Sequence, residues 1–430
     1  MEVRAAKAAN FGRPLIWALF AALLIVLPLL FHSSLALTLL SQMGYLVIVC
    51  LSYNMLLGQG GMLSFGHAVY TGLGAFLAVH AMNLATKGVV PLPLVVIPLV
   101  AGVGGMLFAA LLGYVTTKKS GNTFAMITLG IGELVAAMSL MFPGFFGGEG
   151  GVTTNRVYGT PLFGLTFGPQ IQVYYLIAIY CFVSTMAMFA FTGTPLGRML
   201  NAVRDNPERV EFVGYDTQWV RYIAFVIAGF FAGIGGGLAA INFEIVNASD
   251  SLGAVRSGGY LLFTFLGGAT FFFGPIIGAV LLVLASVLLS EITKAWLLYL
   301  GLVFLLMVMF APGGIASLIM MNLRVAKFGK FRRLIAPYCA LIVSSTIAVA
   351  GAAAIVEMVY HVQLSASLGA KVHFLGIDLD TGSVISWLGA AALLAVGLML
   401  LETVRRHFMR AWGAAQEEIE AELRQREVAR

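Results

Sequence analysis

The chain has 430 residues, of which 60% are hydrophobic and only 10% are charged, and its formal net charge is +6. Its mean hydropathy is +0.96. A soluble domain needs a polar exterior, so this composition excludes a water-soluble globular protein and predicts a chain that sits in lipid.

Apolar runs of about 20 residues, the length that crosses about 30 Å of hydrocarbon, recur along nearly the whole chain. They are continuously apolar rather than alternating, so we expect an all-α membrane protein, a polytopic helical bundle of about 10–12 spans with Gly-broken helices, and not a β-barrel. The predicted spans are 14–31, 35–57, 62–82, 92–115, 122–142, 173–192, 222–242, 258–272, 275–289, 295–311, 335–356 and 384–401.

The first run follows three basic residues, Arg4, Lys7 and Arg13, as the apolar region of a secretory signal does. It is longer than that region usually is, no small-residue cleavage site follows it, and another span begins almost at once. We therefore expect a retained helix.

Basic residues are distributed unevenly between the two sides that these spans define. With both termini in the cytoplasm, twenty Lys and Arg fall inside and five fall outside, as the positive-inside rule expects. The five outside are Lys87, Arg156, Arg256, Lys294 and Lys371. The pattern predicts a multi-pass protein of the cell inner (plasma) membrane with both termini cytoplasmic.

The two apolar pieces between 258 and 289 are too short to span a bilayer upright at about 1.5 Å per residue. They are expected to form a short hairpin or a re-entrant pair broken at Gly274-Pro275. A single long helix is the alternative, and it would put the basic segment 324–333 outside.

The sequence offers no catalytic or metal-binding constellation. Cys50, Cys181 and Cys339 have no paired spacing, and the six histidines form no ligand cluster. The phosphate-binding motif GxxxxGK[ST] and the GxSxG elbow of lipases and esterases are both absent. We expect a protein that is not an enzyme and that binds no metal and no cofactor.

Glycines interrupt several predicted spans, most clearly in 57–74 and 258–278, one in each half of the chain. Small residues allow close helix packing in lipid, whereas irregular backbone at membrane depth survives only beside protein or water. Close packing accounts for most of these glycines, and the alternative is that the broken helices line a translocation path.

Glu133 lies near the middle of a predicted span, where a carboxylate is costly; it is either functional or hydrogen-bonded to a neighbouring helix. Candidate path residues are Gly60, Gly61, Ser64, His67, Glu133, Gly267, Gly268, Gly274 and Pro275; for His67 a packing role is favoured over a ligand role.

One long polar stretch, 193–221, interrupts the apolar runs and carries four arginines. Asn206, Pro207 and Glu208 are typical of a helix start, and Gly214 can end that helix after about two turns. Such a helix presents charge and an aromatic anchor to a cytoplasmic partner; the alternative is an interfacial loop whose arginines only fix orientation. Candidate coupling residues are Arg198, Arg204, Asn206, Glu208, Arg209, Glu211 and Gly214.

Five segments resemble those of one family. LGQGGMLSFGHAVYTGLGAF at 57–76 and NTFAMITLGIGEL at 122–134 are similar to the Gly-rich segment and the TLxxxE span of LivM-type permeases of branched-chain amino acid ABC transporters. The stretch 196–240 resembles their cytoplasmic loop and following helix, and GGYLLFTFLGGATFFFGPIIGAVLL and FAPGGI follow in the same order. The likeness covers about residues 13–320.

The resemblance implies a permease subunit of an ATP-driven importer. In such an importer a homologous LivH-type permease forms the other half of the pore, two ATP-binding subunits hydrolyse ATP, and a periplasmic solute-binding protein delivers the substrate. The polar loop would then dock a short coupling helix into the ATP-binding subunit.

Beyond that core the chain continues for about a hundred residues. We expect an importer permease core at 1–320, a basic cytoplasmic linker at 321–334, two additional transmembrane helices at 335–402 and a charged cytoplasmic tail at 403–430. On the outside, the Gly-rich loop 143–172 either receives the solute-binding protein or forms a lid over the pore.

The resemblance favours branched-chain or related hydrophobic amino acids as substrates. Similar permeases serve urea, amide and aromatic-acid importers. An ion-coupled secondary carrier is the main rival class, because a layout of twelve spans is also common there, but carriers commonly use several buried ionisable groups and this bundle offers few. A channel or membrane scaffold is a further alternative.

Overall fold

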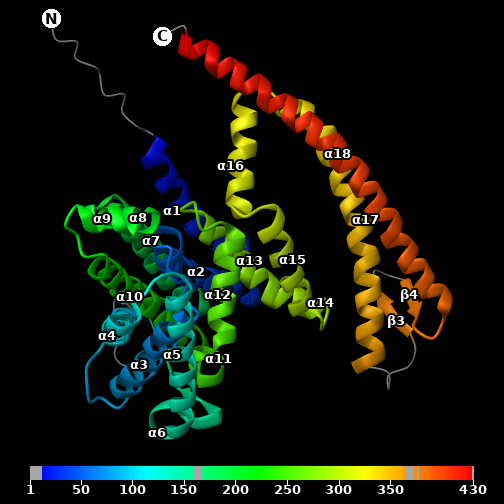
Figure 1. The fold of residues 1–430 in the computed structure, drawn as a ribbon. Coiled ribbons are helices and arrows are strands. Elements are labelled where there is room, and N and C mark those ends of the chain that lie inside the picture. The colour runs from blue at the N-terminus through cyan, green and yellow to red at the C-terminus, as the bar shows by residue number, and fades with distance from the viewer. Residues whose placement is uncertain (1–11, 159–165, 365–370, 375–376, 429–430) are drawn as a thin grey trace, which may run out of the picture. The chain divides into compact units, whose positions relative to one another are not determined.

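The computed structural model describes residues 12–158, 166–364, 371–374 and 377–428. It contains two compact units, Met1–Leu284 with Pro312–Ala316, and Ala285–Ala311 with Ser317–Arg430. Each unit is helical, as Figure 1 shows, and each is described by itself below.

The first unit contains the following helices: α1 Gly12–Leu30, α2 Ser34–Asn54, the π-helix η1 Met55–Gln59, α3 His67–Thr86, η2 Leu94–Val96, α4 Ile97–Thr116, α5 Gly121–Met141, α6 Pro143–Phe146, η3 Gly148–Gly150, α7 Gln170–Gly193, α8 Pro195–Asp205, α9 Pro207–Phe212, α10 Thr217–Phe243, α11 Ala248–Leu252, α12 Ala254–Gly267 and α13 Gly274–Leu284. Strands β1 Val152–Thr153 and β2 Ile245–Val246 form an antiparallel pair in which Val152 faces Val246 and Thr153 faces Ile245.

The centre of this unit is α10, which packs against α2, α3 and α4. Its glycines allow that approach: a Cβ at Gly236 would run into the Thr71 carbonyl of α3, and one at Gly233 into the Ala101 carbonyl of α4. Close backbone contact through small residues is the usual way helices associate in lipid, where apolar burial alone drives little.

The all-α polytopic class that the sequence predicts is confirmed. Among the described residues, nine helices are long and apolar enough to cross a membrane, or ten if the bent pair α15–α16 is one span. Helix α12 has only 14 residues, about 21 Å, and is too short to cross. The loop 268–273 separates it from α13, so the single long helix across 258–289 is excluded.

The second unit contains η4 Ala285–Leu289, α14 Ser290–Ile292, α15 Trp296–Phe310, α16 Gly314–Lys327, α17 Phe331–Leu364, strands β3 Lys371–Phe374 and β4 Ile377–Asp380, and α18 Val384–Val428. The strands form a hairpin between α17 and α18. Helix α18 runs for 45 residues without a break, so the apolar part and the charged tail expected after 402 belong to one helix.

The charged end of α18 packs back onto its own unit. Val325, Leu334 and Ile419 form a fully buried apolar cluster there. Beside it, Lys330 Nζ lies 2.5 Å from Glu418 Oε2 and 3.2 Å from Glu422 Oε1. The hydrogen bonds to these two acids raise the pKa of Lys330.

Candidate functional site

Helices α8 and α9 form an elbow at one end of the first unit, and α6 lies at the opposite end (Figure 1). The helix predicted to begin at Pro207 is confirmed as α9, Pro207–Phe212. Asn206 Oδ1 accepts a hydrogen bond from the Arg209 amide at 2.9 Å, which caps the helix, and Gly214 follows it with φ +95.

Helix α8 was not predicted from the sequence, although its start carries a signal. The Thr194 hydroxyl accepts a hydrogen bond from the Gly197 amide at 3.1 Å, and Pro195 occupies the first helical position. Thr194-Pro195 is thus the same cap-and-proline signature as Asn206-Pro207, which follows twelve residues later.

The tip of the elbow exposes apolar side chains in a polar stretch. Phe212 is 90% exposed and Val213 71%. Between α8 and α9 lies a hollow of about 360 Å³, lined by Met199, Ala202, Asp205, Asn206, Arg209, Val210, Val213 and Tyr215. An exposed aromatic beside a lined hollow indicates an interaction surface. The seven candidate coupling residues all lie on this elbow and are exposed, namely Arg198, Arg204, Asn206, Glu208, Arg209, Glu211 and Gly214.

The elbow is fastened to α10. Glu211 Oε1 accepts a hydrogen bond from the Thr217 hydroxyl at 2.8 Å. Asp216 Oδ1 accepts from the amides of Gln218 at 2.8 Å and Trp219 at 3.2 Å, which caps α10. Glu211 thus connects the end of α9 to the first residue of the central helix.

The elbow also contacts the first Gly-broken segment. The Arg204 guanidinium donates a hydrogen bond to the Gly58 carbonyl in the π-helical turn that ends α2. Gly61 has φ +62, and a Cβ there would lie 2.8 Å from Arg204 Cγ. Leu200 of α8 is fully buried next to Gly60. These contacts join the predicted coupling segment directly to the predicted path.

The first break, residues 60–66, is held by buried polar groups. The Tyr53 hydroxyl donates to the Ser64 carbonyl at 2.9 Å, and Ser52 Oγ lies 2.9 Å from His67 Nε2. Ser64 and His67 are both fully buried in this chain. His67 thus has the hydrogen-bonded packing role that the sequence favoured, and its role in a path stays a prediction.

The second break lies against the first. Helix α12 ends at Gly267, Gly268 has φ +114, and α13 begins at Gly274 with Pro275 in its first turn. A Cβ at Gly58 would run into the Ala269 carbonyl, so the backbones of the two breaks touch. The structure therefore brings together the two Gly-rich regions that lie two hundred residues apart in sequence.

Two ionisable side chains lie on α5 and α12 beside the first break. Glu133 is exposed on α5. A Cβ added to its neighbour Gly132 would lie 3.6 Å from the Cα of Gly66. Arg256 is the other, and its place in an outside segment stays a prediction. It lies in the first turn of α12, where Nε donates to the Tyr260 hydroxyl at 3.0 Å.

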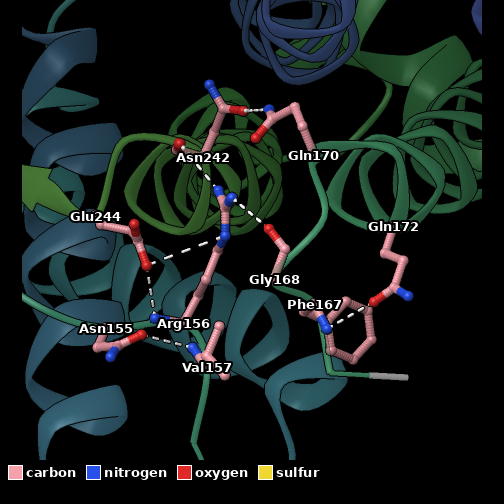
Figure 2. Close-up of polar contacts among 9 residues, drawn as sticks. All are labelled: Asn155, Arg156, Val157, Phe167, Gly168, Gln170, Gln172, Asn242 and Glu244. Carbon is pink, nitrogen blue, oxygen red and sulfur yellow. Dashed lines mark hydrogen bonds and ion pairs between the residues drawn. The ribbon is translucent and has the colours of Figure 1, made fainter. Parts of the chain in front are cut away.

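At the opposite end of the unit, Arg156 ties the loop before α7 to the end of α10 (Figure 2). Its amide donates to Glu244 Oε1 at 2.8 Å, and its Nη2 donates to the Gly168 carbonyl at 3.0 Å. Gln170 Nε2 donates to Asn242 Oδ1 at 2.7 Å. The Arg156 side chain is only 12% exposed, so this polar cluster is a built connection rather than a surface ion pair.

The architecture defines a class of protein. A bundle of membrane-length helices with two touching helix breaks and a polar elbow fixed to one of them is that of a membrane permease. The chain belongs to the family described as branched-chain amino acid transport system permease component, whose match covers residues 35–312.

Two relatives carry the same description. The chain is 26% identical over 293 residues to the high-affinity branched-chain amino acid transport system permease protein LivM of Escherichia coli (strain K12), covering 63% of this chain and 67% of the relative. The LivM protein of Salmonella typhimurium (strain LT2) matches with the same identity and coverage. No solved structure matches. The resemblance to LivM-type permeases is confirmed.

Proposed function

We propose that this chain is the transmembrane permease subunit of an ATP-driven importer for branched-chain amino acids. It forms half of the translocation path and holds no cofactor itself. A homologous LivH-type subunit forms the other half, two ATP-binding subunits hydrolyse ATP, and a periplasmic solute-binding protein delivers the substrate.

The observation that carries the proposal is the contact between the elbow and the first helix break. The exposed tip of α9 offers Phe212 to a partner, and α8 reaches the Gly58 carbonyl through Arg204. A partner that closes on the elbow therefore moves the backbone of 58–61, which in turn touches the second break at Ala269. Force applied outside the lipid reaches the path through two contacts.

The distribution of charge supports the orientation. The elbow carries Arg198, Arg204 and Arg209, and the positive-inside rule places such a segment in the cytoplasm of the inner membrane, where ATP-binding subunits are available. The end with β1, β2 and Arg156 then faces the periplasm and receives the solute-binding protein. Both termini are cytoplasmic in this arrangement.

The substrate class is inferred from the relatives, whose names specify branched-chain amino acids. Urea, amides and aromatic acids are the alternatives within similar permeases. Uptake competition separates them: labelled leucine uptake by cells that rely on this chain is expected to be suppressed by unlabelled isoleucine and valine and unaffected by urea. The reverse pattern would contradict the assignment.

The source of energy is tested by deleting the genes for the proposed ATP-binding subunits. We expect leucine uptake to be abolished while the chain still inserts in the membrane. Intact uptake in the deletion strain would indicate an ion-coupled secondary carrier instead.

A further inference from the structure

An acidic side chain near the middle of α5 has no partner within the described chain. Glu133 is twelve residues after the first residue of α5, Gly121, and eight before its last, Met141. Helix α5 is long and apolar enough to cross a membrane, so Glu133 lies about 18 Å along the helix from one end and about 12 Å from the other. Its side chain is exposed, and among the described residues it takes part in no ion pair and no hydrogen bond.

The face of α5 that carries Glu133 is exposed along its whole length. The helix packs into its own unit through a buried face that consists of Phe124, Ala125, Thr128, Gly132, Val135 and Ser139. The opposite face is exposed at every third or fourth position, at Thr123, Met126, Gly130, Glu133, Ala137 and Leu140. Alternating steps of three and four residues are the spacing with which two membrane helices pack side by side. Helix α5 thus has one face in its own bundle and a second face with the pattern of a helix contact.

Small side chains on both sides of Glu133 leave room for a neighbouring helix. Gly130 precedes it by three residues, and Ala137 follows it by four. A Cβ at Gly130 would meet nothing within 4 Å, whereas one at Gly233 in the centre of the unit would run into the Ala101 carbonyl. The notch at Gly130 is therefore not filled by this chain, and small residues at such positions allow close approach of helices in lipid.

Lipid is a poor occupant for this face. A carboxylate at the centre of a bilayer is costly on every scale, and ionisable side chains in membrane spans face a bundle interior or a water-filled cavity. Glu133 is exposed in the described chain. Something other than the described residues therefore covers it in the membrane.

The neighbours of Glu133 favour a helix over a column of water. Met126, Leu134 and Leu140 are 66%, 56% and 70% exposed on this side of α5. Between residues 126 and 141, Glu133 is the only polar side chain that is exposed. A water-filled path needs polar groups at several depths, whereas one polar contact within an apolar seam is how helices associate in lipid.

The second unit of the chain and a second copy of the chain are both poor complements. In α17 the arginines Arg332 and Arg333 lie in the first turn, and the first arginine of α18 is Arg405, beyond its apolar part. Helix α15 has no Lys or Arg. A two-fold contact between identical copies about this face would bring two Glu133 carboxylates together, which is unfavourable. The complement is a hydrogen-bond donor on a different subunit.

We propose that the exposed face of α5 is the contact with the homologous permease subunit, and that Glu133 accepts a hydrogen bond there from a donor side chain on a spanning helix of that subunit. The inference rests on the proposed function, which includes that subunit, and it assigns the surface on which the two halves meet. Glu133 then holds the halves together. The buried face of the same helix reaches the first break, because Thr128 Oγ1 accepts a hydrogen bond from the Phe65 amide at 3.1 Å.

The surface is tested in the complete transporter in its native membrane, with different affinity tags on this chain and on the second permease subunit. The photo-crosslinking amino acid p-benzoylphenylalanine replaces Met126 or Leu140 on α5. Leu111 is the matched control, because it is 70% exposed on a different spanning helix, α4. We expect covalent adducts with the second permease subunit from both α5 positions and far fewer from Leu111.

Substitutions test Glu133 and the notch separately. E133L removes the acceptor, and E133Q keeps an acceptor oxygen. G130L fills the notch, and G389L is its control, because Gly389 is equally open and lies in the apolar part of α18, outside the family match. We expect E133L and G130L to lower co-purification of the second subunit about tenfold, since polar contacts and close packing hold such a seam together. E133Q should lose less than E133L, and G389L should match the wild type.

Failed insertion does not explain a loss of the partner in E133L, because leucine enters lipid more easily than glutamate. Adducts only with lipid, with the second unit of the same chain or with a second copy would overturn the surface. Equal adducts from Leu111, or undiminished co-purification in both E133L and G130L, would also overturn it. A wild-type chain that co-purifies with no second permease subunit would instead refute the proposed function.

Discussion

Removing the side chain of Arg204 should uncouple the elbow from the path. The Arg204 guanidinium donates to the Gly58 carbonyl, and its side chain is 38% exposed. A hydrogen bond to a charged group contributes about 1.5–3 kcal/mol. Partial exposure puts this one at the lower end, so R204A should weaken the connection by about 1.5 kcal/mol, which corresponds to roughly tenfold.

The assay is the ratio of leucine transported to ATP hydrolysed by the purified transporter in proteoliposomes. We expect R204A to lower that ratio roughly tenfold while ATP hydrolysis continues, because docking on α9 is untouched. K119A is the matched control, since Lys119 is an exposed cation on another loop. If R204A and K119A give the same ratio, the elbow does not act through Gly58.

Three further perturbations test the packing. R156A removes a side chain that is 12% exposed and hydrogen-bonded to the end of α10. The backbone amides of 152–157 should then exchange hydrogen faster, with about 1.5 kcal/mol less protection, and K87A should leave their exchange unchanged. G236A places a methyl group against a backbone carbonyl of α3, so thermal stability in detergent should drop by about 1–3 kcal/mol, whereas G130A, with nothing within 4 Å, should be tolerated. K330Q breaks two ion pairs between Lys330 and the tail, so trypsin should cut the tail faster at neutral pH. Because the pKa of Lys330 is raised, the wild-type ion pairs should weaken only when the pH rises through this raised pKa.

Much of the architecture followed from local patterns in the sequence. Continuous apolar runs predicted the membrane helices, and Asn206-Pro207 with Gly214 predicted α9. These features depend on near neighbours in sequence, such as a cap, a fixed φ or a length of hydrocarbon to cross. The same cap signature at Thr194-Pro195 was present and unused, so α8 was missed although its signal was local.

The rest depends on contacts between distant segments. The Arg204–Gly58 bond spans 146 residues, and nothing in either segment encodes it locally. The connection of Arg156 to the end of α10 has the same character, since its partners Gly168, Asn242 and Glu244 come from separate parts of the chain.

The central claim is that an external ATP-hydrolysing subunit drives this bundle through the α8–α9 elbow. The most direct measurement is leucine accumulation by the reconstituted transporter with its solute-binding protein, in sealed proteoliposomes, under two energy sources. We expect accumulation with MgATP at the elbow side and none with a proton or sodium gradient alone. Accumulation driven by an ion gradient, without nucleotide or the ATP-binding subunits, would contradict the account.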